Sequence, residues 1–420
     1  MKLLIVHQNM PGQYRELMRW IVEALRAGQR HEVVFLTQRK KFEAPKGITK
    51  LLYRPHHSAG DKAYGLSKIW EQAVGAGYGA VLALEDHEKN TGFRPDLIIG
   101  HTGWGEMLFL NQLWPDVPKL GFFEYFYAVE GGPVGFDPAE PKNAQAPFLQ
   151  EARNAVPYAS LHQVDRLTTP TQWQADRFPE LFRKNMYVCH DGIRTDQLKP
   201  NSDVSLSLGR VSAPITRDDE IFTYVARNME NMRGFQTYMR ALPKILKARP
   251  KARALIVGGN DVSYGKRSPS DGGFRAEMEA EVGHLVDWDR VHFLGRVPYD
   301  TFKSIIQIGR CHIYLTMPFV LSWSLLEAMS MEATIVASDV APVREVMTKG
   351  ESGLLVDFFD PDALADRVVE VLAKPKSYAA LGKAARAHVV AHHDFKTVCL
   401  PRHLTEMNAL VPESAGHFWF

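Results

Sequence analysis

Residues 221–235 read IFTYVARNMENMRGF and predict a buried strand that turns directly into a helix. The apolar run 221–226 is typical of a strand, and we expect a helix to begin near Gly234. The loop between them carries two cations six residues apart, Arg227 and Arg233. Such a turn presents free backbone N–H groups and the positive end of a helix dipole, which suits a phosphate. Two guanidiniums would neutralise a diphosphate, and the alternative of two solvated surface arginines stays open here.

Short apolar runs alternate with longer amphipathic segments along the whole chain. Expected strands are residues 3–6, 33–36, 97–99, 120–122, 166–168, 221–226, 254–257, 291–294, 313–315, 334–337 and 353–356. Helical spacing of apolar residues marks the segments 15–27, 364–372 and 378–390. This alternation is typical of parallel sheets joined by crossover helices. We therefore expect an α/β fold with two parallel sheets.

The composition of residues 201–214 changes to Ser, Asp and Pro without an apolar period. We place a boundary there, between an N-terminal domain of residues 1–205 and a C-terminal domain of residues 206–395. Residues 396–420 form a tail that ends in His-Phe-Trp-Phe. We expect this aromatic tail to pack back on the N-terminal domain, with a membrane or partner contact as the alternative.

Composition excludes several classes of protein. The 420 residues include 50 Lys and Arg against 48 Asp and Glu, so no whole-chain positive field exists to hold a nucleic acid. Cys189, Cys311 and Cys399 lie far apart without a CxxC pair, which argues against a disulfide framework or structural zinc. The apolar run 3–6 is shorter than a secretion signal needs, and no long apolar run could span a membrane. We expect a soluble cytoplasmic protein.

A second loop, residues 318–329, reads PFVLSWSLLEAM and follows the expected strand 313–315. Ser322 or Ser324 can cap a helix that starts there, and backbone amides from Ser322 to Ser324 would face an anion. Glu327, one turn later, could accept two hydroxyls of a ribose. The alternative is a helix-surface glutamate, but its apolar neighbours favour a functional partner.

The C-terminal half resembles family 4 glycosyltransferases, which have the two-Rossmann GT-B architecture with sheets facing a central cleft. The motifs that carry the resemblance are LLEAM at 325–329, TIVASD at 334–339, VRE at 343–345, Gly350, GLLV at 353–356, VHFLGRV at 291–297, IVGG at 256–259, and Val188 with HDGI at 190–193. They cover most of residues 165–395 in the family's order.

The resemblance implies a role for each matching residue. Arg227 and Arg233 would bind the donor diphosphate, with Arg233 in place of the family's usual lysine and shifted by one residue. Glu327 matches the second acid of a pair separated by seven residues, and the first acid falls at Phe319. The contact usually made to the donor sugar's hydroxyls is therefore lost or supplied by another group. The donor-binding set so implied is Gly12, Arg227, Arg233, Gly258, Arg296, Ser322, Trp323, Ser324 and Glu327.

The N-terminal half resembles the family less closely. Gly12, in Pro-Gly-Gln after the first strand, would allow the close backbone approach of a loop to the donor phosphates. His101, beside glycines at the end of another strand, matches a family histidine near the reacting carbon, and we expect it to be exposed. Glu124 follows a strand in FFEYFY and is a candidate acceptor-binding or base residue. The alternative is that Glu124 only anchors the long loop after it.

The function that the resemblance implies is a retaining glycosyltransferase that moves a sugar from a nucleoside diphosphate sugar to a glycan, lipid-linked or small-molecule acceptor. His101, Arg227 and Arg233 would be its catalytic residues, in cell-surface polysaccharide or glycoconjugate synthesis. We expect a UDP-sugar rather than a GDP-sugar, and no cofactor or metal, because cations and a helix end already face the leaving group. Nucleic acid is not an expected partner.

Three alternatives and one false signal remain. The replacement at Phe319 also suits a nucleotide-sugar hydrolase, a transferase to a small acceptor, or a non-catalytic nucleotide-sugar-binding protein. The basic run 39–50 is either solvated surface or a peripheral contact with the inner face of a membrane. Asp287-Trp288-Asp289 mimics a metal-binding DxD, but it precedes a strand and is better explained as a surface turn.

Overall fold

The computed structural model describes residues 1–141, 143–209 and 213–418, which form two compact units. The first unit combines Met1–Gly192 with the chain from Phe395 onward, and the second is Ile193–Asp394. Residues 193–205, expected in the N-terminal domain, thus lie in the second unit. The Ile193 amide donates to the carbonyl of His393 at 2.8 Å, and the Leu198 carbonyl accepts from Ser330 Oγ at 2.7 Å. The predicted compositional change at 201–214 falls inside that unit, and residues 210–212 lie outside the described ones.

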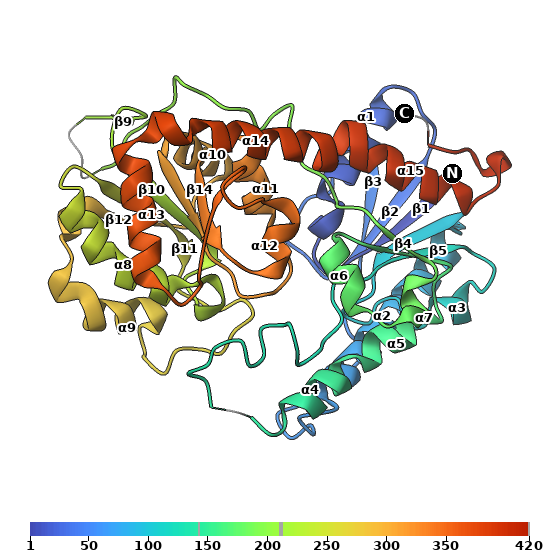
Figure 1. Cartoon of the computed structure of the whole chain (residues 1–420). Coiled ribbons are helices and arrows are strands. Elements are labelled where there is room, and N and C mark those ends of the chain that lie inside the picture. The colour runs from blue at the N-terminus through green and yellow to red at the C-terminus, as the bar shows by residue number, and fades with distance from the viewer. Residues whose placement is uncertain (142, 210–212, 419–420) are drawn as a thin grey trace. The chain divides into compact units, whose positions relative to one another are not determined.

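The first unit is built on a seven-stranded parallel sheet (Figure 1). In spatial order its strands are β3 (Ile48–Leu52), β2 (Glu32–Thr37), β1 (Lys2–Val6), β4 (Leu97–His101), β5 (Lys119–Phe122), β6 (Arg166–Thr169) and β7 (Met186–Val188). The inner strand β1 is buried on both faces, which explains why its sequence is a continuous apolar run after Lys2. The predicted strands of this half are confirmed, and β3 and β7 are additional.

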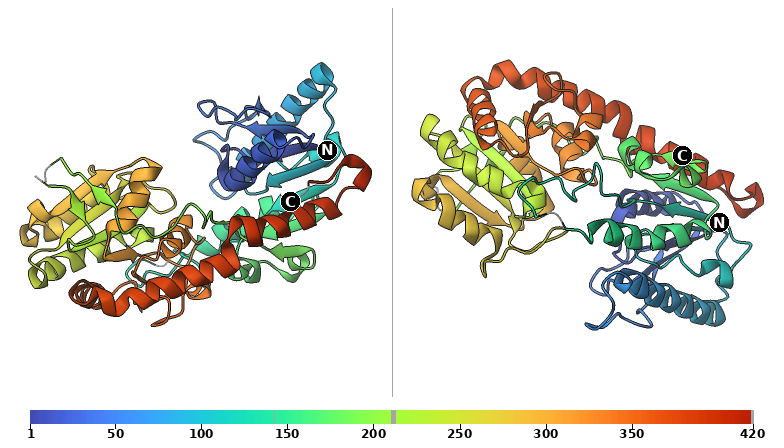
Figure 2. Two further views of the ribbon diagram at one scale, coloured as in Figure 1. Left: turned by 90° about the horizontal axis from the view of Figure 1, so that it is seen from above. Right: turned by 60° about the horizontal axis from the view of Figure 1, so that its bottom comes forward.

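Helices cover both faces of this sheet (Figures 1 and 2). They are η1 (Gly12–Tyr14), α1 (Arg15–Arg26), α2 (Lys68–Thr91), α3 (Leu110–Leu113), α4 (Ala146–Arg153), α5 (Ala155–Leu161), α6 (Gln172–Arg177), α7 (Glu180–Arg183), η5 (Phe395–Cys399), α15 (Leu400–Ala409) and η6 (Glu413–Ala415). Leu4 and Val6 of β1 pack with Ala80 and Leu84 of α2 on one face. Leu3 and the α1 and α15 side chains form the core on the other.

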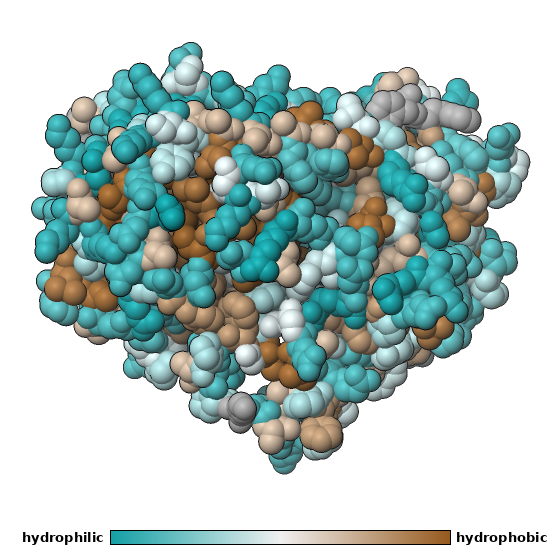
Figure 3. All heavy atoms as spheres, viewed as in Figure 1, coloured by the Kyte–Doolittle hydropathy of each residue, from teal (hydrophilic) through white to brown (hydrophobic). Residues whose placement is uncertain are grey.

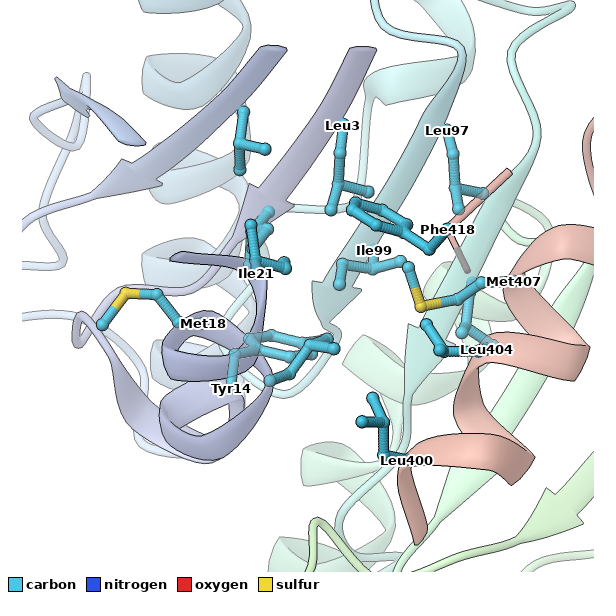
Figure 4. Close-up of a cluster of buried hydrophobic side chains, with 14 of the residues drawn as sticks. Leu3, Tyr14, Met18, Ile21, Leu97, Ile99, Leu400, Leu404, Met407 and Phe418 are labelled. Atoms are coloured by element: carbon cyan, nitrogen blue, oxygen red, sulfur yellow. The ribbon is translucent and has the colours of Figure 1, made fainter. Parts of the chain in front are cut away.

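The returning C-terminal segment completes that second core (Figure 4). Leu400, Leu404 and Met407 of α15 point toward the β4 side chains in Figure 4, and Phe418 packs edge-on against Trp20 at 5.6 Å. Leu404 is 4% exposed and Phe418 is 1% exposed. The segment after Phe395 is therefore part of the hydrophobic core of the first unit. The last two aromatic residues of the predicted tail, 419 and 420, lie outside the described residues.

The second unit repeats the plan with a six-stranded parallel sheet. Its order is β12 (Val291–Gly295), β11 (Arg253–Gly259), β10 (Ile221–Asn228), β13 (Cys311–Tyr314), β14 (Ile335–Ser338) and β15 (Leu354–Val356), and β8 (Ser205–Leu206) pairs antiparallel with β9 (Ile215–Thr216). Its helices are η2 (Asn231–Arg233), α8 (Phe235–Ala248), α9 (Gly273–Val282), η3 (Gly283–Leu285), η4 (Trp288–Arg290), α10 (Tyr299–Ile308), α11 (Trp323–Ser330), α12 (Ala341–Val346), α13 (Pro361–Ala373) and α14 (Pro375–His393). The predicted α/β class and two parallel sheets are confirmed.

Polar side chains cover most of the face of the molecule seen in Figure 3. Among the described residues, no helix is both long and apolar enough to cross a membrane.

Candidate functional site

The candidate donor site lies at the carboxyl ends of strands in the second unit. Arg227 lies near the end of β10, Arg233 lies in η2 just after that strand, and the turn after β12 holds Arg296. Helix α11, with Glu327, begins a few residues beyond β13. All these strands run parallel, so their carboxyl ends meet at one edge of the sheet, where open α/β sheets bind ligands. The topology thus places these residues at the same edge of the sheet.

Arg233 is held in a fixed position by its neighbours. Its Nη1 donates to Thr316 Oγ1 at 2.9 Å, and its backbone carbonyl accepts from the Tyr224 hydroxyl at 2.8 Å. The next residue, Gly234, has φ +64°, and a Cβ there would lie 2.5 Å from Leu315 Cβ. Only glycine therefore fits between this loop and β13. A half-buried guanidinium fixed in this way is already oriented for an anion.

Arg227 differs from Arg233 because it is exposed and has no hydrogen bond or ion pair within the described chain. It lies in a β-bulge: Val225 pairs with Val257 and Asn228 with Gly259, so β10 carries one extra residue. The structure thus provides an oriented arginine in η2 and an exposed arginine at the end of β10. That arrangement is compatible with either reading of Arg227 that the sequence leaves open.

A buried carboxylate, which the sequence analysis missed, joins two of the loops. Glu230 is 0% exposed, and its Oε2 accepts the backbone amides of Ser263, Tyr264 and Gly265 at 3.0, 3.3 and 3.4 Å. The Tyr264 ring then lies 5.9 Å from the Arg233 guanidinium. Glu230 therefore fixes the loop after β11 beside Arg233.

Arg296 and the glycines after β11 form a second polar contact. Arg296 Nη2 donates to Asn228 Oδ1 at 3.1 Å, and Asn228 Nδ2 donates to Ser263 Oγ at 2.8 Å. A Cβ at Gly259 would lie 2.6 Å from Asn228 Oδ1, and one at Gly258 would lie 3.1 Å from the carbonyl of Ala226. Both predicted residues, Gly258 and Arg296, are thus brought to the same edge as the arginine loop.

The start of α11 is less open than the sequence predicts. Ser322 is the N-cap residue, but its side chain makes no capping hydrogen bond, and its amide donates to the Tyr314 hydroxyl at 3.2 Å. Ser324 Oγ instead donates to Ser322 Oγ at 3.2 Å. The expectations of a serine side-chain cap and of a free Ser322 amide are therefore wrong, because the Tyr314 hydroxyl accepts the hydrogen bond of this amide. Trp323 and Ser324 begin the helix and are half-buried.

Glu327 lies on the buried side of α11. It is 4% exposed, and its Oε1 accepts from the Tyr299 hydroxyl at 2.8 Å. Tyr299 is thus a partner for this buried carboxylate within the protein, and the ribose contact stays a prediction. The pair was not predictable from the sequence, because Tyr299 comes from the first turn of α10, after another strand.

The first unit places three predicted residues next to one another. His101 ends β4 and stacks on Trp104, with ring centroids 3.9 Å apart. His101 is 2% exposed, so the expected exposure is wrong: the Trp104 ring lies over it. Glu124 Oε2 lies 3.5 Å from His101 Nε2, and Gln13 Nε2 donates to Glu124 Oε1 at 2.7 Å. Gly12, before Gln13, has φ +52° and lies against the His7 ring, where a Cβ would be 2.3 Å from Nε2.

Two family models match the two halves of the chain. The model described as the glycosyl transferase family 4 group matches residues 29–198, and the model described as glycosyl transferases group 1 matches residues 210–388. The chain belongs to the family 4 glycosyltransferases.

The names of several curated relatives of this glycosyltransferase refer to inositol compounds. A GDP-mannose-dependent monoacylated alpha-(1-6)-phosphatidylinositol monomannoside mannosyltransferase of Corynebacterium glutamicum is 26% identical over 240 residues, covering 54% of this chain and 58% of that protein. A phosphatidyl-myo-inositol mannosyltransferase of Mycobacterium tuberculosis is 28% identical over 192 residues, covering 43% of this chain and 45% of that protein. The chain spans about half the length of the curated relatives it matches.

Solved structures show that the glycosyltransferase has the two-domain GT-B fold. Sucrose-phosphate synthase from Thermosynechococcus elongatus matches with a TM-score of 0.70 at 19% identity, covering 97% of this chain and 98% of that one. Anabaena Alr3699/HepE, solved with UDP and glucose, matches with a TM-score of 0.64 at 15% identity, covering 97% of this chain and 99% of that one. The predicted family and GT-B architecture are confirmed.

In this glycosyltransferase an aromatic contact occupies the position of the first family acid. Phe319 is half-buried, and its ring centroid lies 5.1 Å from that of Tyr264. Tyr264 is in turn fixed by Glu230 through backbone amides. The missing acid is thus replaced by an aromatic pair, which a single sequence does not reveal because Tyr264 comes from a different loop.

The signals that the sequence analysis discounted have ordinary structural roles. Asp287 Oδ2 accepts from Arg290 Nε at 2.7 Å, and this contact lowers the pKa of Asp287. Within the described residues, no three His, Cys, Asp or Glu side chains gather as they would around a metal ion.

Proposed function

We propose that this glycosyltransferase transfers a sugar, with retention at the anomeric carbon, from a nucleoside diphosphate sugar to a hydroxyl of a glycan or lipid-linked acceptor. The second unit binds the donor, and the first unit recognises the acceptor. The observation that carries the proposal is Arg233, fixed on Thr316 at 2.9 Å beside the exposed Arg227. Two guanidiniums on one strand-to-helix loop suit the two charges of a diphosphate.

The proposed chemistry is stabilisation of the leaving group. When the bond between the sugar and the diphosphate breaks, negative charge grows on the terminal phosphate. Arg227 and Arg233 compensate for this charge, and Arg233 does so without reorganisation because Thr316 already holds it. Glu327, steadied by Tyr299, accepts hydroxyls of the ribose, and in the first unit Glu124, beside His101, binds a substrate hydroxyl.

For the donor we propose a GDP-sugar, with mannose as the first candidate. The Corynebacterium glutamicum relative is named as GDP-mannose-dependent, whereas nothing in the second unit favours the UDP-sugar expected from the sequence. The names of the relatives, phosphatidylinositol mannosides and inositol phosphates, support an acceptor with a polyol headgroup. Such a role would bring the protein to the inner face of a membrane.

A direct test is sugar transfer from radiolabelled GDP-mannose, and separately from UDP-glucose, to a crude cell-envelope lipid extract. Label in the lipid fraction that depends on Arg227 and Arg233 supports the proposal. Label in none of the fractions, while either donor binds, would favour a non-catalytic sugar-nucleotide-binding protein.

A second candidate, hydrolysis of the nucleotide sugar, is favoured by Phe319 in place of an acid. It predicts that nucleotide release proceeds equally with and without the lipid extract. Acceptor-dependent release distinguishes transfer from hydrolysis.

A further inference from the structure

A chain of polar side chains in the first unit leads from β1 to Glu124. It starts at His7, which follows β1, passes through Gln13 in η1, and reaches Glu124 after β5. The far oxygen of Glu124 faces His101 at the end of β4. Glu124 and His101 are candidate site residues from the sequence, whereas His7 and Gln13 have no role in the proposed function.

Backbone amides fix the protonation pattern at both ends of the chain. The Asn9 amide donates to His7 Nδ1 at 2.9 Å, and the Gly103 amide donates to His101 Nδ1 at 3.0 Å. An imidazole nitrogen that accepts a hydrogen bond carries no proton, so each neutral ring carries its proton on Nε2.

The direction of the chain then follows step by step. His7 Nε2 donates to Gln13 Oε1 at 2.6 Å, so the amide of Gln13 must turn its Nε2 toward Glu124. Gln13 Nε2 donates to Glu124 Oε1 at 2.7 Å, which leaves Glu124 Oε2 facing His101 Nε2 at 3.5 Å. The opposite amide orientation would place NH₂ against the N–H of His7.

Burial of His7 keeps the direction of these hydrogen bonds the same over the pH range of the folded protein. His7 is 1% exposed, and burial together with the nearby His101 ring lowers the pKa of His7 to about 3, against the smaller opposing effect of Gln13. His7 therefore stays neutral and keeps a single proton on Nε2. The absence of a side chain at Gly12 permits this contact, because a Cβ there would overlap the His7 ring.

Glu124 is the member of the chain that a ligand can reach. Its side chain is 27% exposed, whereas His101 is 2% exposed. Gln174 Nε2 holds the Glu124 backbone by donating to its carbonyl at 2.5 Å. His101 Nε2 is buried and faces Glu124 Oε2, so a substrate hydroxyl would donate to the exposed part of the Glu124 carboxylate, with His101 behind it.

We infer that His7 and Gln13 are positioning residues that hold the Glu124 carboxylate in one orientation beside the buried His101, where Glu124 binds a substrate hydroxyl. The part that concerns the hydroxyl rests on the proposed function. The positioning itself is a property of the free protein and does not depend on it.

Nitrogen-15 NMR of histidine-labelled full-length protein tests the positioning without any ligand. We expect the Nε2–H tautomer for both His7 and His101 in the wild type. In Gln13→Ala we expect the Nε2–H proton of His101 to shift upfield, because the carboxylate is no longer held near it. His7→Phe, which keeps a ring but removes the donor, should shift the same signal in the same direction.

Gln172→Ala is the matched control. Gln172 Nε2 also donates to a carboxylate, Asp176 Oδ1, at 2.7 Å, and this pair lies on the exposed side of α6 in the same unit. It should leave the His101 signal in place. An Nδ1–H tautomer at either ring, or an unchanged His101 signal in both Gln13→Ala and His7→Phe, would overturn the inference.

The transfer assay tests the functional part separately. We expect Gln13→Ala to lower turnover about tenfold to a hundredfold, since small misplacement of a contact group has such effects, with donor affinity unchanged within about twofold. An NMR shift with full turnover would contradict the role at the substrate hydroxyl. Loss of donor binding in the wild type would instead contradict the proposed function alone.

Discussion

Arg227 and Arg233 differ in how well their side chains are ordered before a ligand binds. Arg233 is oriented by Thr316 before any ligand arrives, whereas Arg227 is exposed and must be ordered on binding. Fixing a long side chain has an entropic cost of up to about 2 kcal/mol. The Arg233 side chain loses most of this entropy already on folding, so its removal should slow the reaction more than removal of Arg227.

Arg233→Ala should slow transfer by raising its activation free energy by about 2–4 kcal/mol, as the loss of one preorganised donor does in other enzymes. Arg227→Ala should have a smaller but measurable effect. Arg240→Ala is the control, because Arg240 on α8 is exposed and pairs with Glu281 on another helix. Steady-state kinetics with GDP-mannose would measure all three, and equal rates for Arg233→Ala and Arg240→Ala would contradict the site.

Glu327 offers a second prediction at this scale. Glu327→Gln should weaken donor binding about tenfold, because an amide accepts ribose hydroxyls less strongly than a carboxylate does. Tyr299→Phe should have a smaller effect, because Tyr299 only steadies Glu327. Calorimetric titration compares the two. A larger loss of donor affinity in Tyr299→Phe than in Glu327→Gln would mean that Glu327 is not the residue that binds the ribose.

At the level of elements, buried strands were predictable and half-exposed ones were not. The residues of β1 and β4 form short apolar runs because both faces of each strand are covered. In strand β3 only Ile48 is buried, and β7 has three residues, so neither gives a clear run. The sequence signal therefore follows burial more closely than hydrogen bonding.

Helix α2 shows why another element escaped prediction. It contains Gly75 and Gly79, which lower helix propensity. A Cβ at these positions would lie 2.0 Å from the His57 carbonyl oxygen and 2.1 Å from that of Arg54. The glycines are thus explained by the close approach of another segment. Such long-range contacts also hid His7, Gln13, Glu230 and Tyr299 from the sequence analysis.

Helix α15 makes the core of the first unit depend on the end of the chain. Leu404→Ala should lower the free energy of unfolding by about 2–5 kcal/mol, the usual cost of truncating a buried leucine. Leu181→Ala on α7 is the control, since Leu181 is 60% exposed and its loss should cost less than about 0.5 kcal/mol. Urea unfolding followed by circular dichroism would compare them. Similar values for both would contradict the packing of α15.

On the scale of the whole molecule, buried histidines predict sensitivity to acid in both units. Burial lowers the pKa of His7 and of His190 to about 3 and that of His312 to about 4. The unfolded chain binds these protons near pH 6.5 and the folded chain does not. Their contribution to stability is therefore complete above pH 6.5 and falls as the pH drops toward the folded pKa values.

Urea unfolding at pH 7, 6 and 5 should show this loss, at about 1.4 kcal/mol per pH unit for each such histidine below its unfolded pKa. His312→Gln should flatten the dependence in the second unit by about one histidine's share. His284→Gln should not, because His284 is exposed. Stability that stays constant from pH 7 to pH 5 would mean that these rings are not buried as neutral groups.

The central claim is that the second unit binds a nucleoside diphosphate through the loop between β10 and α8. Isothermal titration calorimetry with GDP, UDP and ADP, on the wild type and Arg233→Ala, tests it most directly. We predict selective binding of one diphosphate, GDP before UDP, weakened at least tenfold by the substitution. Binding of none of the three, or equal binding by wild type and Arg233→Ala, would contradict the account.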